Sequence, residues 1–144
     1  MKKSTKKQIF TIIILIAFLG SSLAFAINYA IPSGNQVQAN WRAGLSIVIF
    51  NDLYPIPADI GVKNETYDKL FTLNSDGIIY KTGEESATLG EFFKIWGENF
   101  NSTCILDYCN NENNSMRMYV NNIENFDYEL YSIKNNDFIL IDYR

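Results

Sequence analysis

The sequence predicts an α+β domain in which a mixed sheet packs on one helix, preceded by an N-terminal hydrophobic helix. Three observations predict this fold. One strongly amphipathic helical segment lies near the middle of the chain, strand-like segments with turn signals lie on both sides of it, and a basic, apolar stretch begins the chain. At 144 residues the chain has room for one ordinary domain and an anchor.

The helix is predicted over Thr88–Phe100. Thr88 is a good N-cap, and Glu91 three residues later completes a capping box. At 100° per residue the apolar side chains form one stripe, and the charged ones lie opposite. The stripe consists of Leu89, Phe92, Phe93, Trp96 and Phe100. We interpret it as the face that packs on the sheet and not as a ligand-binding face.

The start of the chain predicts a membrane anchor or an export signal. Lys2, Lys3, Lys6 and Lys7 precede the apolar run Ile9–Phe18. An uncleaved helix from Ile9 to Ala30 is about 33 Å long, enough to cross a bilayer, whereas a signal peptide cleaved after Ala26 fits the same residues. Both interpretations place the lysines in the cytoplasm and the domain outside it. We divide the chain into the anchor or signal peptide at 1–30, a linker at 31–40 and an extracytoplasmic domain at 41–144.

Strand-like segments surround the helix. The predicted strands, in chain order, are Leu45–Phe50, Leu53–Val62, Ile78–Thr82, Ile105–Tyr108, Met116–Val120, Tyr128–Ile133 and Phe138–Tyr143. Pro55 and Pro57 cannot donate to a ladder, so the second strand is expected at a sheet edge. Strands on both sides of a single helix, separated by hairpin turns, predict a β-grasp-like fold, a mixed sheet curled over the helix.

Charge and composition exclude several functions. From Ile27 onward the chain has eight Lys/Arg and sixteen Asp/Glu, a net charge of 8 − 16 = −8. An acidic domain argues against nucleic-acid binding, which needs clustered cations. The chain has no histidine, so the usual general base and the commonest metal ligand are both missing. We therefore expect a protein that is not an enzyme and has no metal or cofactor.

Cys104 and Cys109 are the only cysteines. Outside the cytoplasm we expect them to form a disulfide, with free thiols or a redox or metal pair as the alternatives. Zinc needs four Cys or His ligands, which two thiols do not supply. Three Asn-x-Ser/Thr sequons predict glycosylation at Asn64, Asn101 and Asn113 in a host that glycosylates.

Several segments resemble a family of uncharacterised archaeal and bacterial proteins that are small, extracytoplasmic and anchored by one N-terminal helix. The resemblance is carried by Leu45–Val62, Asp76–Ile79, Thr88–Gly97 and Met118–Asn121. It implies the same location but no known activity. Members of that family have several histidines and an acid where this chain has Asn40, Arg42, Gly44, Phe71, Leu73, Asn74 and Tyr80. If those histidines bind metal in the family, this chain has lost the site.

The chain is rich in aromatic residues, with nine Tyr and ten Phe. We expect some of them to form an exposed protein-binding surface, or else to pack on the outer face of the sheet. The candidates are Tyr54, Tyr67, Tyr80, Tyr108, Tyr119, Tyr128 and Tyr131. The first functional hypothesis is a non-catalytic binding or structural module that is held at the membrane and contacts a protein partner. The alternatives are a degenerate metal- or small-ligand-binding sensor domain and an extracellular hydrolase.

Overall fold

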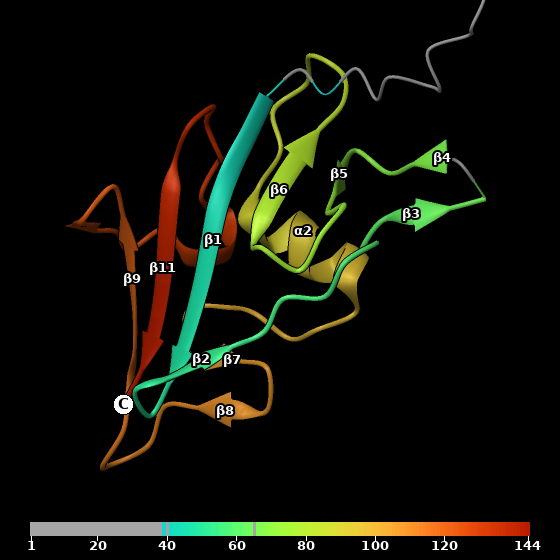
Figure 1. Cartoon of the computed structure of the whole chain (residues 1–144). Coiled ribbons are helices and arrows are strands. Elements are labelled where there is room, and N and C mark those ends of the chain that lie inside the picture. The colour runs from blue at the N-terminus through green and yellow to red at the C-terminus, as the bar shows by residue number, and fades with distance from the viewer. Residues whose placement is uncertain (1–38, 40, 65) are drawn as a thin grey trace, which may run out of the picture. The chain divides into compact units, whose positions relative to one another are not determined.

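The computed structural model describes residues 39, 41–64 and 66–144, which belong to one compact unit, Gln38–Arg144 (Figure 1). The predicted N-terminal helix lies outside the described residues. The elements of the described part are β1 (Trp41–Ile49), β2 (Asp52–Tyr54), β3 (Val62–Lys63), β4 (Thr66–Tyr67), β5 (Leu70–Phe71), β6 (Ile78–Lys81), α2 (Leu89–Trp96), β7 (Cys104–Ile105), β8 (Tyr108–Cys109), β9 (Met116–Val120), β10 (Ile123–Glu124), the 3-10 helix η1 (Tyr128–Leu130) and β11 (Phe138–Tyr143).

The main sheet has seven strands, six of which lie in the order β10-β9-β11-β1-β6-β5. The central strands β1 and β11 are parallel, and all the other pairs in this sheet are antiparallel. β2 pairs with the last three residues of β1, on the edge that β6 occupies nearer the start of that strand. The described residues therefore form an α+β domain, a mixed sheet with one α-helix.

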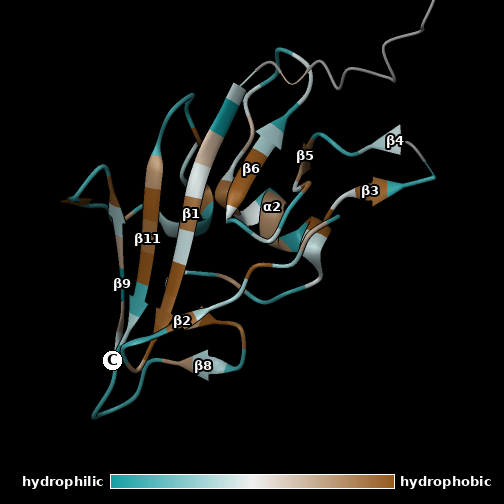
Figure 2. Ribbon diagram, in the orientation of Figure 1, coloured by the Kyte–Doolittle hydropathy of each residue, from teal (hydrophilic) through white to brown (hydrophobic). Residues whose placement is uncertain are grey.

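The core lies on the face of the sheet that α2 covers. Along β1 the alternate residues Ala43, Leu45, Ile47 and Ile49 are buried, as the two-residue period of a strand requires. Inward residues of the neighbouring strands join them, namely Ile79, Met116, Met118, Val120, Ile139, Ile141 and Tyr143. Figure 2 shows this alternation as bands of different hydropathy along β1. These inward side chains of the sheet are thus all part of the hydrophobic core.

The beginning of α2 is the predicted one. The Thr88 hydroxyl accepts from the Glu91 amide at 3.2 Å, and the Glu91 carboxylate accepts from the Thr88 amide at 2.7 Å. The helix ends earlier than predicted, at Trp96, because Gly97 takes a left-handed conformation with φ 87°. The amides of Gly97 and Glu98 both donate to the Phe93 carbonyl and close the last turn. The prediction of a helix reaching Phe100 is therefore wrong.

The predicted apolar stripe is nevertheless mostly in the core. Leu89, Phe92 and Phe93 are fully buried, and Trp96 is half-buried against Phe93 at 5.5 Å between ring centroids. Phe100 is buried outside the helix, where it forms an isolated bridge with Ile105 and stacks on Phe93 at 4.5 Å. Apolar spacing therefore predicted the burial of Phe100 but not its backbone.

The predicted strand Tyr128–Ile133 is wrong, because its first residues form the 3-10 helix η1 and only Ser132 makes a bridge, with Thr88. The amides of Leu130 and Tyr131 donate to carbonyls three residues earlier, which closes the turn. η1 packs on α2 at Gly90, where an added Cβ would lie 2.8 Å from the Glu129 carbonyl oxygen. A glycine early in α2 therefore allows the two backbones to touch.

Two more predicted strands are shorter than expected. Within Leu53–Val62 only Leu53 and Tyr54 of β2 and Val62, which begins β3, are strand residues. Pro55 and Pro57 supply no amide for a ladder, and β2 does lie at an edge as predicted. Ile105–Tyr108 is not one strand: β7 and β8 form a separate hairpin that turns at Leu106 and Asp107. The predicted strands Ile78–Thr82, Met116–Val120 and Phe138–Tyr143 match β6, β9 and β11 to within one residue.

Candidate functional site

The outer face of the sheet, opposite α2, is the candidate binding surface. None of the described elements packs over its centre (Figure 1). Small residues occupy the outward positions at the middle of β1, where Gly44 and Ser46 alternate with the buried core residues. Large apolar side chains surround them: Leu53 of β2 is 72% exposed and Phe138 of β11 is 50% exposed. We call Gly44, Ser46, Val48, Leu53, Ile78, Tyr119, Phe138 and Leu140 the outer face.

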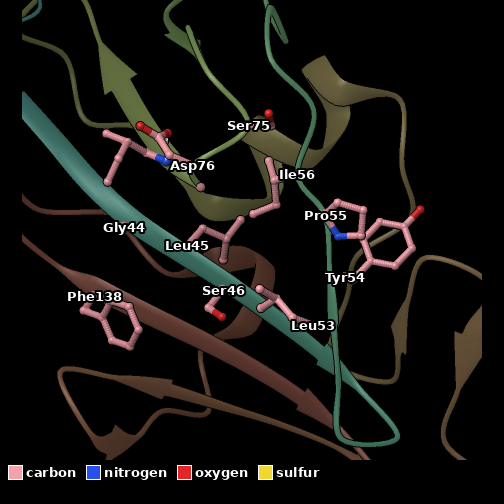
Figure 3. A pocket seen from close by; sticks show the side chains of 12 residues that line it. Gly44, Leu45, Ser46, Leu53, Tyr54, Pro55, Ile56, Ser75, Asp76 and Phe138 are labelled. Atoms are coloured by element: carbon pink, nitrogen blue, oxygen red, sulfur yellow. Dashed lines mark hydrogen bonds between the residues drawn. The ribbon is translucent and has the colours of Figure 1, made fainter.

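A notch of about 270 Å³ opens in the outer face beside β1 (Figure 3). It arises because β6 pairs with Trp41–Gly44 and β2 pairs with Ile47–Ile49, so that the two strands leave the same edge of β1 in between. Leu45 and Ile56, both almost fully buried, lie at its base. The remaining lining residues are Gly44, Ser46, Leu53, Tyr54, Pro55, Ser75, Asp76, Gly77, Ile78 and Phe138.

Specific backbone contacts fix both sides of the notch. On the β6 side the Gly77 carbonyl accepts from the Leu45 amide at 2.8 Å. Gly77 has φ +75°, and an added Cβ would lie 2.4 Å from the Leu45 carbonyl oxygen, so only glycine fits. On the other side the buried Thr72 hydroxyl donates to the Pro57 carbonyl at 2.9 Å and accepts from the Ile60 amide at 3.1 Å. The segment that supplies Pro55 and Ile56 is therefore hydrogen-bonded to Thr72, the residue after β5.

The notch contains one charged side chain. Asp76 accepts a hydrogen bond from the Ile78 amide at 3.0 Å through one carboxylate oxygen. Neither Lys nor Arg lines the notch, and the two ion pairs found among the described residues, Lys69–Glu91 and Arg144–Asp142, do not involve Asp76. The notch is thus an apolar hollow with a carboxylate at one end.

A row of aromatic side chains continues the outward-facing side toward β5. Arg42, Tyr80 and Phe71 are directly opposite one another on β1, β6 and β5. Phe71 stacks on Tyr80 at 5.6 Å between centroids, and Tyr67 of β4 lies 4.7 Å from Phe71. Phe71 is fully buried in this row although it lies outside the main core. This end of the sheet is therefore packed, unlike the outer face.

The buried polar groups serve the fold. The Asp137 carboxylate accepts from the Tyr131 hydroxyl at 2.8 Å, the Lys134 amide at 2.7 Å and the Asn121 side chain at 3.0 Å. Burial and the bond to Asp137 raise the pKa of Tyr131. The buried Lys81 ammonium donates to the Gly83 carbonyl and lies 5.3 Å from the centre of the Trp41 ring. These contacts join turns to strands, and none of these side chains lines the notch.

The predicted cysteine pair is confirmed as a pair. Cys104 and Cys109 are directly opposite each other in the β7–β8 hairpin, with their sulfurs 2.04 Å apart.

The predicted glycosylation sites differ in access. Asn64 and Asn113 are exposed, whereas Asn101 is half-buried and its side-chain oxygen accepts from Thr103 and Cys104. Glycosylation itself stays a prediction, with Asn101 the least accessible acceptor.

The predicted tyrosine surface needs correction. Of the seven tyrosines, only Tyr108 is exposed; Tyr131 is buried, and the other five, Tyr54, Tyr67, Tyr80, Tyr119 and Tyr128, are half-buried. Among the described residues the exposed Phe and Tyr side chains are Tyr108 and three phenylalanines, Phe50, Phe126 and Phe138. None of the tyrosines named from the sequence is an exposed residue of the outer face, and the pattern that could have indicated this face is Gly44 and Ser46, small residues at alternate positions of a central strand.

Within the described residues no group of three or more His, Cys, Asp or Glu side chains could hold a metal ion. No helix in this part of the chain is long and apolar enough to span a bilayer, and the segment predicted to do so is outside it. Comparisons of the chain with models of protein families, with curated proteins and with solved structures find no match.

Proposed function

We propose that this protein is a non-catalytic binding module that the N-terminal helix holds at the membrane, with its domain outside the cytoplasm. It binds a protein partner through the outer face. The observation that carries the proposal is the pair of exposed apolar side chains beside the small residues of β1 on that face: Leu53 and Phe138 are 72% and 50% exposed, while the opposite face is filled by the core. Exposed apolar patches on folded domains commonly mark protein interfaces.

The arrangement of charged groups supports a non-catalytic role. General acid–base catalysis needs at least one positioned titratable group with a reacting atom in reach, and most hydrolases combine a nucleophile with a base. The notch combines two serines with one carboxylate, and neither Lys nor Cys lines it. Asp76 already accepts from the Ile78 amide, which makes it a turn residue.

We also propose that the domain is β-grasp-like. Its supports are the parallel central pair of β1 and β11, the antiparallel strands on either side of that pair, and the single α-helix between the first and second groups of strands. The proposed location is supported by the four N-terminal lysines before an apolar run and by the Cys104–Cys109 pair, since stable disulfides are typical of oxidising compartments. Cleavage after Ala26 would release the same domain.

Site-specific photocrosslinking tests the proposed interface. A photoreactive benzoylphenylalanine replaces Leu53 or Phe138 in the full-length protein, in membranes of its own host. The matched control carries the same group at Leu130, which is 75% exposed but lies on η1, the 3-10 helix that packs on α2. We expect one discrete crosslinked protein from Leu53 and Phe138 and not from Leu130. No crosslink, or the same products from all three positions, would contradict the proposal.

The alternative is a degenerate metal- or small-ligand-binding sensor domain that has lost its histidine site and binds its ligand through other residues. One observation favours it: Arg42, Tyr80 and Phe71, three positions where the resembled family has histidine, lie in one cross-strand row. Side chains opposite each other on neighbouring strands are close enough to share a ligand. Elemental analysis of the purified full-length protein tests the metal part, and the absence of a stoichiometric metal rules it out.

A further inference from the structure

We propose that the notch holds one large apolar side chain of the partner protein and that Asp76 pairs with a basic residue beside that side chain. This inference rests on the proposed function and names the group that the outer face binds. It joins two independent features, the apolar hollow at the base of the notch and the single carboxylate at its end.

The small volume and the open side of the notch suit a side chain that projects from a larger partner. Pockets for small-molecule ligands usually enclose roughly 300–1,000 Å³ and bury most of the ligand. The notch, at about 270 Å³, is at the lower end of this range and opens onto the outer face, so it does not enclose its occupant. Its base is Leu45 and Ile56, which offer apolar contact and no hydrogen bonds from their side chains. An aromatic or long aliphatic side chain fits such a hollow.

The surroundings of the notch favour a protein as the source of that side chain. Leu53 and Phe138 lie at its rim, and the outer face continues past them to Leu140 and Tyr119 across β11 and β9. A ligand the size of the notch would leave most of these side chains in water. A polypeptide would cover them while one residue enters the hollow, as anchor residues of protein interfaces do.

Charge complementarity indicates which kind of residue lies beside the inserted side chain in the partner. Asp76 is the only charged group that lines the notch, and no described Lys or Arg forms an ion pair with it. The domain as a whole carries twice as many acids as bases, which disfavours an acidic partner segment. A Lys or Arg next to the anchor would meet the carboxylate, whereas an acid there would be repelled.

Capped dipeptides test this recognition on the full-length protein in lipid nanodiscs. The probes are acetyl-Phe-Lys-amide, acetyl-Phe-Glu-amide and acetyl-Ala-Lys-amide, and the readout is the methyl NMR shifts of Leu45, Ile56 and Ile78, with the Ile105 methyls in the core as the internal control. We expect the Phe-Lys probe to bind about fivefold more tightly than the Phe-Glu probe, because each exposed charge interaction contributes up to about 1 kcal/mol. The Ala-Lys probe should not shift these methyls.

Two variants separate the hollow from the charge. In Asp76→Asn the side-chain oxygen still accepts from the Ile78 amide, and the Phe-Lys and Phe-Glu probes should bind equally. In Ser46→Phe the new ring fills the notch, and neither probe should bind. Equal binding of both Phe probes to the wild-type protein, or no shift at the notch methyls, would overturn the inference. If crosslinking from Leu53 and Phe138 still succeeds in that case, the binding function stands and only the assignment of the notch falls.

Discussion

The two faces of β1 belong to the same nine residues but have opposite roles. Its inward residues Leu45, Ile47 and Ile49 are almost fully buried among the side chains of α2 and the neighbouring strands. Its outward residues Gly44 and Ser46 are small, and the apolar side chains around them are exposed. Core packing explains the first set completely. It does not explain why Leu53 and Phe138 face water, and that difference is why we assign binding to the outer face.

The largest expected contrast is between a core aromatic residue and an outer one. Phe92→Ala removes a fully buried ring that packs against Phe93 and Trp96, and should lower the free energy of unfolding by about 3–5 kcal/mol. Phe138→Ala should lower it by less than about 1 kcal/mol because half of the side chain is already in water. Denaturant unfolding of both variants measures the difference. Similar losses would mean that the outer face is part of the core.

The disulfide hairpin belongs with the inner face, because Ile105 and Leu106 within it are buried. Replacing both Cys104 and Cys109 by serine should lower the free energy of unfolding by about 2 kcal/mol, the chain-entropy value for a loop this short. The wild-type protein under reducing conditions should match the variant. If crosslinking from Leu53 in the variant fell to zero, the hairpin would be part of the binding surface and the contrast between the faces would weaken.

The close approach of α2 and η1 also contributes to the stability of the core side of the domain. Gly90→Ala adds a Cβ 2.8 Å from the Glu129 carbonyl oxygen and 3.0 Å from its Cβ, so η1 must move away. The expected net loss is about 1–2 kcal/mol, since overpacking outweighs the helix propensity gained. Lys94→Ala, an exposed position of the same helix, is the control and should change stability little. A stabilised Gly90→Ala variant would show that η1 is free to shift.

The capping box of α2 makes the free energy of unfolding weakly dependent on pH. The hydrogen bond from the Thr88 amide, together with Lys69, lowers the pKa of Glu91 from its usual 4.5. Because the pKa of Glu91 is lower in the folded protein than in the unfolded chain, the stabilisation is fully present above about pH 4.5. It is lost as the pH falls through the folded-state pKa. The wild-type protein should exceed Glu91→Gln in unfolding free energy by less than about 1 kcal/mol at pH 6. The gap should close toward pH 3, and a gap that stays constant would contradict this cause.

The sequence predicted the core better than the outer face for a physical reason. Burial imposes periodic spacing, so the stripe from Leu89 to Trp96 and the alternation in β9 were readable directly. The end of α2 at Gly97 and the turn of η1 depend on backbone conformation and tertiary contact, which periodicity does not report. The notch depends on two distant strands that leave the edge of β1 at Gly77 and Tyr54. No local sequence pattern predicts that β2 and β6 leave the edge of β1 at neighbouring positions.

The smallest expected effect on stability is also the sharpest test of the comparison. Leu53→Ala removes a side chain that is 72% exposed on an edge strand, so the free energy of unfolding should change by less than about 0.5 kcal/mol. The same substitution should strongly reduce crosslinking from a photoreactive group at Phe138, because it removes apolar contact at the rim of the notch. Leu130→Ala, a similarly exposed position on η1 beside α2, should change neither quantity. A Leu53→Ala variant that loses stability but keeps its crosslink would assign Leu53 to folding and remove the main support for a binding face.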